Sequence, residues 1–119
     1  MTRQRKIITD IIMNSMRHMT AEEIFLKAKE EIPTIAIGTV YRNLGLMVND
    51  GDIVQIKMAQ GPDKYDKNVH CHDHAICKNC GNVIDICHLK DILRKATNLN
   101  ITEYDCNIYY LCDKCKKES

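Results

Sequence analysis

The apolar residues in the first half of the sequence recur every three or four positions in three separate segments, which is the period of an amphipathic helix. The first segment, residues 3–16, carries four isoleucines on one face. The second, residues 20–32, opens with Thr20 and has Glu23 three residues later, which is the pattern of a capping box. The third covers residues 36–48. The sequence therefore predicts three consecutive helices.

Strand-like alternation follows these helices. After an Asn-Asp-Gly-Asp turn, residues 53–58 alternate between apolar and polar side chains, and residues 64–66 can return beside them after a second turn. Three helices followed by a β-hairpin are the outline of a winged helix-turn-helix. We expect this arrangement in a first domain, residues 1–66.

The remaining residues, 67–119, are expected to form a smaller mixed domain. Strands are predicted at 82–86 and within 101–111, and we expect these two to pair. A helix is predicted over 88–98, with four inward side chains: Leu89, Ile92, Leu93 and Ala96. Because about fifty residues bury little apolar surface, a metal, oligomerisation or both should stabilise this part. The expected fold class is α+β, a winged helix followed by a small α/β domain.

Cysteine usage changes this picture most. Four of the seven cysteines form two CxxC pairs, Cys77 with Cys80 and Cys112 with Cys115. Four thiolates suit a tetrahedral Zn(II) and leave no open position, so we favour a structural zinc. Dithiol redox pairs and plain buried cysteines are the alternatives. The other three cysteines belong to no pair of this kind.

A second set of metal-ligating residues lies around the first CxxC pair. His72 and His74 alternate, so an extended segment places them on one face, and Asp66 and Asp85 lie nearby in the sequence. Imidazole and carboxylate ligands suit Fe(II), Mn(II) or Zn(II). The alternative is a group of structural or solvent-exposed polar residues. We favour two metal sites, one of sulfur and one of nitrogen and oxygen, adjoining at Ile76.

The third predicted helix has polar residues that could contact DNA. Thr39, Tyr41, Arg42 and Asn43 are placed on or near its outer face, where they can reach phosphates and base edges. A solvated polar face is the alternative. The net charge of +1 neither indicates nor excludes a nucleic-acid partner. No apolar run is long enough for a membrane helix, and no secretory signal is evident, so a cytoplasmic protein is expected.

Four stretches together resemble the ferric uptake regulator (Fur) family of metal-dependent transcriptional repressors. They are residues 17–24 (RHMTAEEI), 38–44 (GTVYRNL), 72–81 (HDHAICKNCG) and the closing 112–115 (CDKC). The resemblance implies a winged helix, a C-terminal dimerisation domain, a homodimer on a double-stranded DNA operator, and a structural zinc on the four paired cysteines. It also implies a regulatory Fe(II) or Mn(II).

Within that family the sequence looks most like the peroxide-sensing branch. The branch's regulatory ligands fall on five positions: His18, Asp66, His72, His74 and Asp85. The iron-sensing branch tends to have Glu where Asp85 stands. The resemblance makes His18 and His72 the expected targets of oxidation, and it leaves His70 outside the ligand pattern.

The sequence departs from the family at two points. By this resemblance we expect the helix that usually precedes the Arg-rich stretch to be missing, and Ala36 stands where a capping Ser or Thr is expected before the recognition helix. Alternatives to a peroxide-sensing repressor are an iron- or zinc-responsive repressor and a thiol-based redox protein. An enzyme is not expected, because neither HExxH nor the His-x-Glu of zinc deaminases is present.

Overall fold

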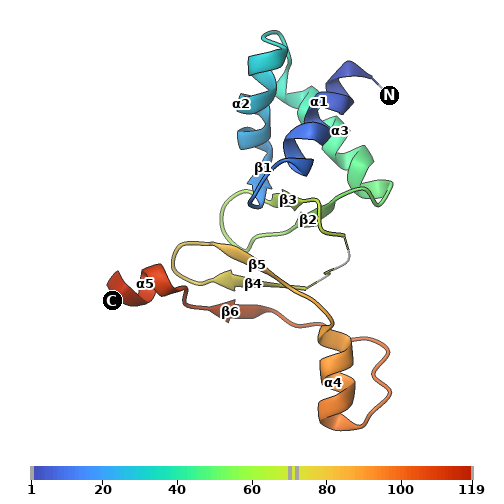
Figure 1. The fold of residues 1–119 in the computed structure, drawn as a ribbon, viewed down its shortest axis with the longest axis vertical. Helices are drawn as coiled ribbons and strands as arrows, with labels where there is room; N and C mark the ends of the chain where they lie inside the picture. Colours follow the sequence, from blue (N-terminus) through green and yellow to red (C-terminus); the bar gives the residue numbers. More distant parts are fainter. Residues whose placement is uncertain (1, 70, 72, 119) are drawn as a thin grey trace. The chain divides into compact units, whose positions relative to one another are not determined.

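The computed structural model describes residues 2–69, 71 and 73–118 and confirms a mixed α and β fold (Figure 1). The chain forms two compact units, Met1–Val69 (unit 1) and His70–Ser119 (unit 2). Among the helices of these described residues, none is both long and apolar enough to cross a membrane.

Unit 1 contains the three predicted helices and a small antiparallel sheet. The helices are α1 (Arg3–Met13), α2 (Ala21–Glu31) and α3 (Ile37–Asn49). The strands are β1 (Met19–Thr20), β2 (Val54–Ile56) and β3 (Lys64–Asp66), in the order β1-β3-β2. The hairpin of β2 and β3 is the expected wing. The short strand β1 was not expected, because two residues are too few to show a period.

The first helix ends at Met13, before the predicted end at residue 16. Lys67 donates from Nζ to the backbone oxygens of Met13 and Ser15, at 3.1 and 2.9 Å. The Ser15 hydroxyl also donates to the Arg17 oxygen at 2.7 Å. The contact with Met13 satisfies a carbonyl group that the helix leaves without a partner at its C-terminus. Together these contacts also fix the loop that leads to His18.

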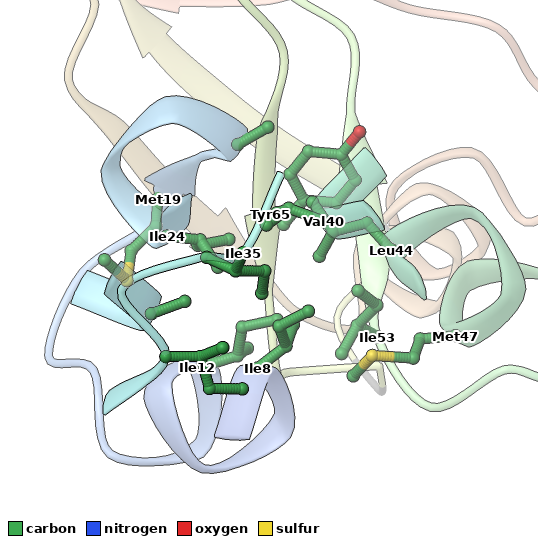
Figure 2. Close-up of a cluster of buried hydrophobic side chains, with 13 residues drawn as sticks. Ile8, Ile12, Met19, Ile24, Ile35, Val40, Leu44, Met47, Ile53 and Tyr65 are labelled. Carbon is green, nitrogen blue, oxygen red and sulfur yellow. The ribbon is translucent and has the colours of Figure 1, made fainter. Parts of the chain in front are cut away.

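The core of unit 1 lies between the helices and the sheet. Figure 2 shows Ile8, Ile24 and Leu44 among the clustered side chains, and each is fully buried. Tyr65 of β3 packs against the same cluster with 6% of its surface exposed. These residues come from all three helices and the sheet, so their burial holds α3 and the wing in a fixed relation within unit 1.

The capping box at the start of α2 is confirmed. The Glu23 backbone N–H donates to Thr20 Oγ1 at 3.2 Å, and the Thr20 N–H donates to Glu23 Oε1 at 3.1 Å. As expected, Ala36 provides no side-chain cap for α3. The N-terminus of α3 therefore keeps backbone donors available to another acceptor.

Unit 2 is built on a second three-stranded sheet. Its strands are β4 (Asp73–Cys77), β5 (Val83–Ile86) and β6 (Ile108–Tyr110), and its helices are α4 (Leu89–Thr97) and α5 (Asp113–Glu118). The order is β5-β4-β6, with β4 antiparallel to β5 and parallel to β6. The strands predicted at 82–86 and within 101–111 therefore lie in one sheet, with β4 between them.

The inward face predicted for α4 was also wrong for the single chain. None of the helix's residues is buried, and Ile92 is 54% exposed. Exposed apolar side chains also lie on the neighbouring sheet, at Ile84 (44%) and Tyr109 (52%). The periodicity correctly located the helix, but within the described part of unit 2 Leu89 and Leu93 are only half-buried.

Candidate metal centres

The four paired cysteines of unit 2 come together at one end of its sheet. Cys77 Sγ lies 3.7 Å from Cys115 Sγ, and Cys80 Sγ lies 3.7 Å from Cys112 Sγ. All four sulfurs are within 4.8 Å of one another. A tetrahedron with Zn–S bonds of about 2.3 Å has sulfur–sulfur edges of about 3.8 Å. The sulfur positions therefore fit a tetrahedral Zn(II).

Local structure explains how the two CxxC pairs meet. Cys77 ends β4, and Gly81 closes the turn after Cys80 with a φ of 79°, a conformation that glycine adopts without strain. The Lys78 N–H donates to the Tyr110 carbonyl at 3.0 Å, which ties this turn to the end of β6. The parallel pairing of β4 with β6 thus brings residues 112–115 beside Cys77.

The electrostatics of the cluster favour a cation. Backbone N–H groups of Cys80 and Cys112 lower the pKa of the Cys77 thiol to about 6. The amide of Asn79 lowers the pKa of Cys115, but Cys112, burial and the other sulfurs outweigh it and raise that pKa to about 12. Four sulfurs this close cannot all be thiolates without a compensating charge. A bound dication supplies that charge.

The first His–Asp pair lies in unit 2. His74 on β4 is directly opposite Asp85 on β5, and His74 Nε2 is 3.3 Å from Asp85 Oδ1. The antiparallel register alone sets this proximity, because opposite residues in a ladder have neighbouring Cβ atoms. The same five-residue strand carries Cys77, so β4 contributes to both candidate metal centres.

The second His–Asp pair lies in unit 1 and is positioned in the same way. Met19 pairs with Tyr65, so His18, one residue before β1, lies across from Asp66 at the end of β3. His18 Nε2 is 3.4 Å from Asp66 Oδ2. Each unit therefore brings together one imidazole and one carboxylate from the five expected ligands. The fifth ligand, His72, lies outside the described residues, as does His70.

Helix α3, the candidate DNA-contacting helix, exposes only some of the four polar residues expected on its outer face. Tyr41 and Arg42 are exposed and Thr39 is partly exposed. The Tyr41 hydroxyl donates to Glu22 Oε1 at 2.9 Å, and this hydrogen bond raises the pKa of Tyr41. The expected outward position of Asn43 was wrong. Asn43 is buried, and its amide donates to the Thr39 carbonyl one turn earlier, at 2.9 Å.

Sequence reasoning missed two contacts in unit 2. Cys71 and Cys87 form a disulfide. The Tyr104 hydroxyl makes a short hydrogen bond to Asp73 Oδ2, which raises the pKa of Tyr104 to about 12. The pairing of Asp73 with Ile86 brings Cys71 near Cys87. That pairing cannot be predicted without knowing where the hairpin turns. Tyr104 lies in a loop without any periodic signal.

Comparison with known proteins identifies the family. Residues 1–110 match the model of the ferric uptake regulator family. The chain belongs to this family. Its members are transcriptional regulators and not enzymes. The match includes all of unit 1 and most of unit 2, and it confirms the family resemblance over three of the four sequence stretches; the fourth, residues 112–115, lies beyond the matched residues.

Two relatives are similar over nearly the whole chain. The peroxide-responsive repressor PerR of Staphylococcus aureus (strain USA300) is 31% identical over 120 residues, covering 97% of this chain and 81% of that protein. The PerR of Staphylococcus epidermidis is 29% identical over 122 residues, covering 98% and 81%.

Two solved structures share the fold. The Campylobacter jejuni peroxide stress regulator has a TM-score of 0.72 and 26% identity, covering 94% of this chain and 88% of that one. The ferric uptake regulator of Francisella tularensis with iron has a TM-score of 0.74 and 27% identity, covering 98% and 93%. The fold is therefore shared with a ferric uptake regulator and with a peroxide stress regulator.

Proposed function

We propose that this Fur-family protein is a peroxide-responsive, metal-dependent repressor that binds operator DNA in the cytoplasm. The observation that carries the proposal is the set of matched His–Asp pairs, His18 with Asp66 and His74 with Asp85, in a chain similar to PerR proteins over nearly its whole length. The pairs supply the imidazole nitrogens and carboxylate oxygens that Fe(II) and Mn(II) accept.

The proposed regulatory site takes its ligands from both units. His18 and Asp66 belong to unit 1, whereas His74 and Asp85 belong to unit 2, and His72 completes the proposed set. A site with ligands on two units binds metal best when both are held in one arrangement. Metal-binding energy then favours that arrangement, which we propose is the one that binds DNA.

The proposed structural zinc is held by Cys77, Cys80, Cys112 and Cys115. Their sulfur–sulfur separations and altered pKa values support a tetrahedral Zn(II). The cluster joins β4 to the C-terminal residues, so zinc would stabilise a unit with a small apolar core.

The proposed assembly is a homodimer on a two-fold operator. The exposed apolar residues of α4 and the sheet, including Ile92, Ile84 and Tyr109, support unit 2 as the dimer-forming part. Ile84 and Tyr109 lie on opposite faces of the sheet, so a second copy packed against either face would remove part of this apolar area from water. In unit 1, Thr39, Tyr41 and Arg42 are the proposed DNA-contacting residues, with Arg42 placed on phosphate.

Peroxide sensing is proposed to act through the ligands themselves. When bound, Fe(II) would supply one-electron reduction of peroxide beside the side chains that hold it. His18 and His72 are the proposed targets, each gaining one oxygen atom. An oxidised imidazole is a poorer ligand, so the regulatory metal and then the DNA would be released.

Operator binding and peptide mass spectrometry together test this function. We expect Mn(II) and Fe(II) each to promote DNA binding by the zinc-loaded protein. Peroxide should then release DNA only from the Fe(II) form, with one oxygen added to a peptide containing His18 or His72. Release that accompanies oxidation of Cys77 or Cys112 instead would show a thiol switch and contradict the proposal.

An iron-responsive repressor is the second candidate, supported by the fold shared with the iron-containing Francisella protein. The two candidates differ in the response to peroxide in the presence of Fe(II). An iron-responsive repressor would release DNA when Fe(II) is chelated, and peroxide would leave its histidines unmodified.

A further inference from the structure

The disulfide between Cys71 and Cys87 closes the open end of the β4–β5 hairpin. The last ladder pair at that end is Asp73 with Ile86, and the two cysteines lie just beyond it with their Cα atoms 4.5 Å apart. Cα atoms at this separation are within the range that a disulfide bridges. The strand register therefore holds these two sulfurs together.

This cysteine pair is separate from the four-sulfur cluster. Cys77 lies at the turn end of the same hairpin, four residues along β4 from Asp73, and Cys80 lies in the turn beyond it. A strand of that length spans about 13 Å. Cys71 and Cys87 therefore cannot replace one of the four cluster ligands while the hairpin is formed, and the cluster is complete without them.

We propose that Cys71 and Cys87 form a reversible dithiol–disulfide site that reacts with peroxide. In the first step, the sulfur of Cys87 attacks the O–O bond, giving a sulfenic acid and one water from hydrogen peroxide. The Cys71 sulfur then displaces the sulfenic oxygen, which leaves as a second water, and the S–S bond forms. Two thiols are oxidised by two electrons and one peroxide is reduced.

Exposure assigns the order of these steps. Cys87 is exposed, whereas Cys71 is 6% exposed. An exposed sulfur meets the oxidant first, and a buried neighbour within reach resolves the sulfenic acid before it is oxidised further. A small dithiol reverses the reaction by two thiol–disulfide exchanges, in which the reductant is oxidised and both protein thiols are restored.

The link also encloses three of the proposed regulatory ligands. Cys71 immediately precedes His72, and Cys87 follows Asp85 by two residues, with His74 between them in the sequence. His74 and Asp85 stay 3.3 Å apart in the disulfide form, so oxidation is compatible with an intact ligand pair. Closing the hairpin end removes fraying, and the oxidised form should bind Mn(II) more tightly. This consequence rests on the proposed function.

Peptide mapping tests the site without requiring DNA or regulatory metal. The fully reduced, zinc-loaded protein is treated with hydrogen peroxide, alkylated and digested. We expect a Cys71–Cys87 cross-linked peptide lacking two hydrogen atoms, with zinc retained and the link reversed by dithiothreitol. Cys71→Ser and Cys87→Ser should each abolish it. Cys106→Ser, which removes another exposed thiol, should not.

Absence of this peptide, or cross-links that involve Cys106 or the zinc cysteines with loss of zinc, would show that the pair is not the reactive site.

Mn(II) titration of the oxidised protein and of the Cys71→Ser/Cys87→Ser variant tests whether the disulfide strengthens metal binding. A severalfold lower Kd is expected for the oxidised form, and an equal or higher Kd contradicts it. The peptide result stands even if metal has no effect on DNA binding.

Discussion

Asp85 lies directly opposite His74 across the β4–β5 ladder, and His74 Nε2 is 3.3 Å from Asp85 Oδ1. The proximity is a consequence of strand register, which places the two Cβ atoms side by side. The side chain of aspartate is short, but at this position it is long enough for the carboxylate to reach the imidazole nitrogen. The side-chain length of residue 85 is therefore a direct test of the proposed regulatory site.

Replacing Asp85 should weaken the regulatory metal site. For Asp85→Asn, we expect the Mn(II) dissociation constant to rise by at least about tenfold, since even loss of a partner outside the ligand set has that effect. Asp85→Glu should also weaken binding, because the extra methylene moves the carboxylate. Isothermal titration calorimetry measures both. Asp91→Asn on the exposed face of α4 is the matched control, and unchanged binding by Asp85→Asn would exclude residue 85 as a ligand.

Loss of one zinc thiolate should destabilise unit 2. Cys112→Ser removes one of the four clustered sulfurs, and we expect loss of stoichiometric zinc, a lower melting temperature and a loss of dimer. A colorimetric zinc assay, calorimetry and sedimentation measure these three effects. Cys106→Ser is the control, since Cys106 is an exposed cysteine outside the cluster. A zinc-free Cys112→Ser dimer that melts like the parent would refute the structural role.

The exposed arginine of α3 should contribute to DNA affinity regardless of sequence. Arg42→Ala removes one proposed phosphate contact, so it should weaken binding to operator and random DNA alike. The slope of log affinity against log salt should also decrease by about one. Fluorescence anisotropy over a salt series measures both. Lys95→Ala in α4 should leave both unchanged. If Arg42→Ala has the same DNA affinity and salt dependence as the parent, this face of α3 does not contact DNA.

Acid should weaken the capping box of α2. Burial raises the pKa of Glu23, but hydrogen bonds from the Thr20 N–H and Arg17 outweigh it, so the folded-state pKa lies below 4.5. Glu23 therefore stabilises the folded state above that pH, and the contribution is lost as the pH falls through the lowered pKa. Because the carboxylate is partly exposed, the effect should be below about 1 kcal/mol.

The variant Glu23→Gln isolates this contribution. In urea unfolding, the parent should be more stable than the variant near neutral pH, and the difference should shrink below pH 4.5. Glu30→Gln on the same helix is a control for a surface carboxylate. A parent–variant difference that stays constant from neutral to acidic pH would show that the charge of Glu23 does not stabilise the cap.

Local sequence signals were sufficient for most of unit 1. The apolar period located α1, α2 and α3, and the capping box specified the start of α2, because these features depend on residues within a turn of one another. One error came from a local hydrogen bond that the apolar period does not reveal. Asn43 is polar but turns inward, since its amide finds an acceptor on the preceding turn of the same helix.

Prediction was weaker for unit 2, where long-range pairing decides the arrangement. The sequence suggested strands but did not show that β4 lies between β5 and β6. The CxxC pairs indicated the sulfur cluster because their spacing is a local signal. The Cys71–Cys87 link and the Tyr104–Asp73 hydrogen bond depend on strand register and loop path, which no short stretch of sequence encodes.

The central strand of unit 2 has a consequence for how this chain can change during evolution. His74 and Cys77 are three residues apart on β4, and an odd separation directs them to opposite faces of the sheet. Inserting or deleting a single residue between them would turn one of the two side chains to the wrong face. Length variation among descendants should therefore accumulate in the 98–107 connection, while the spacing from His74 to Cys77 stays fixed.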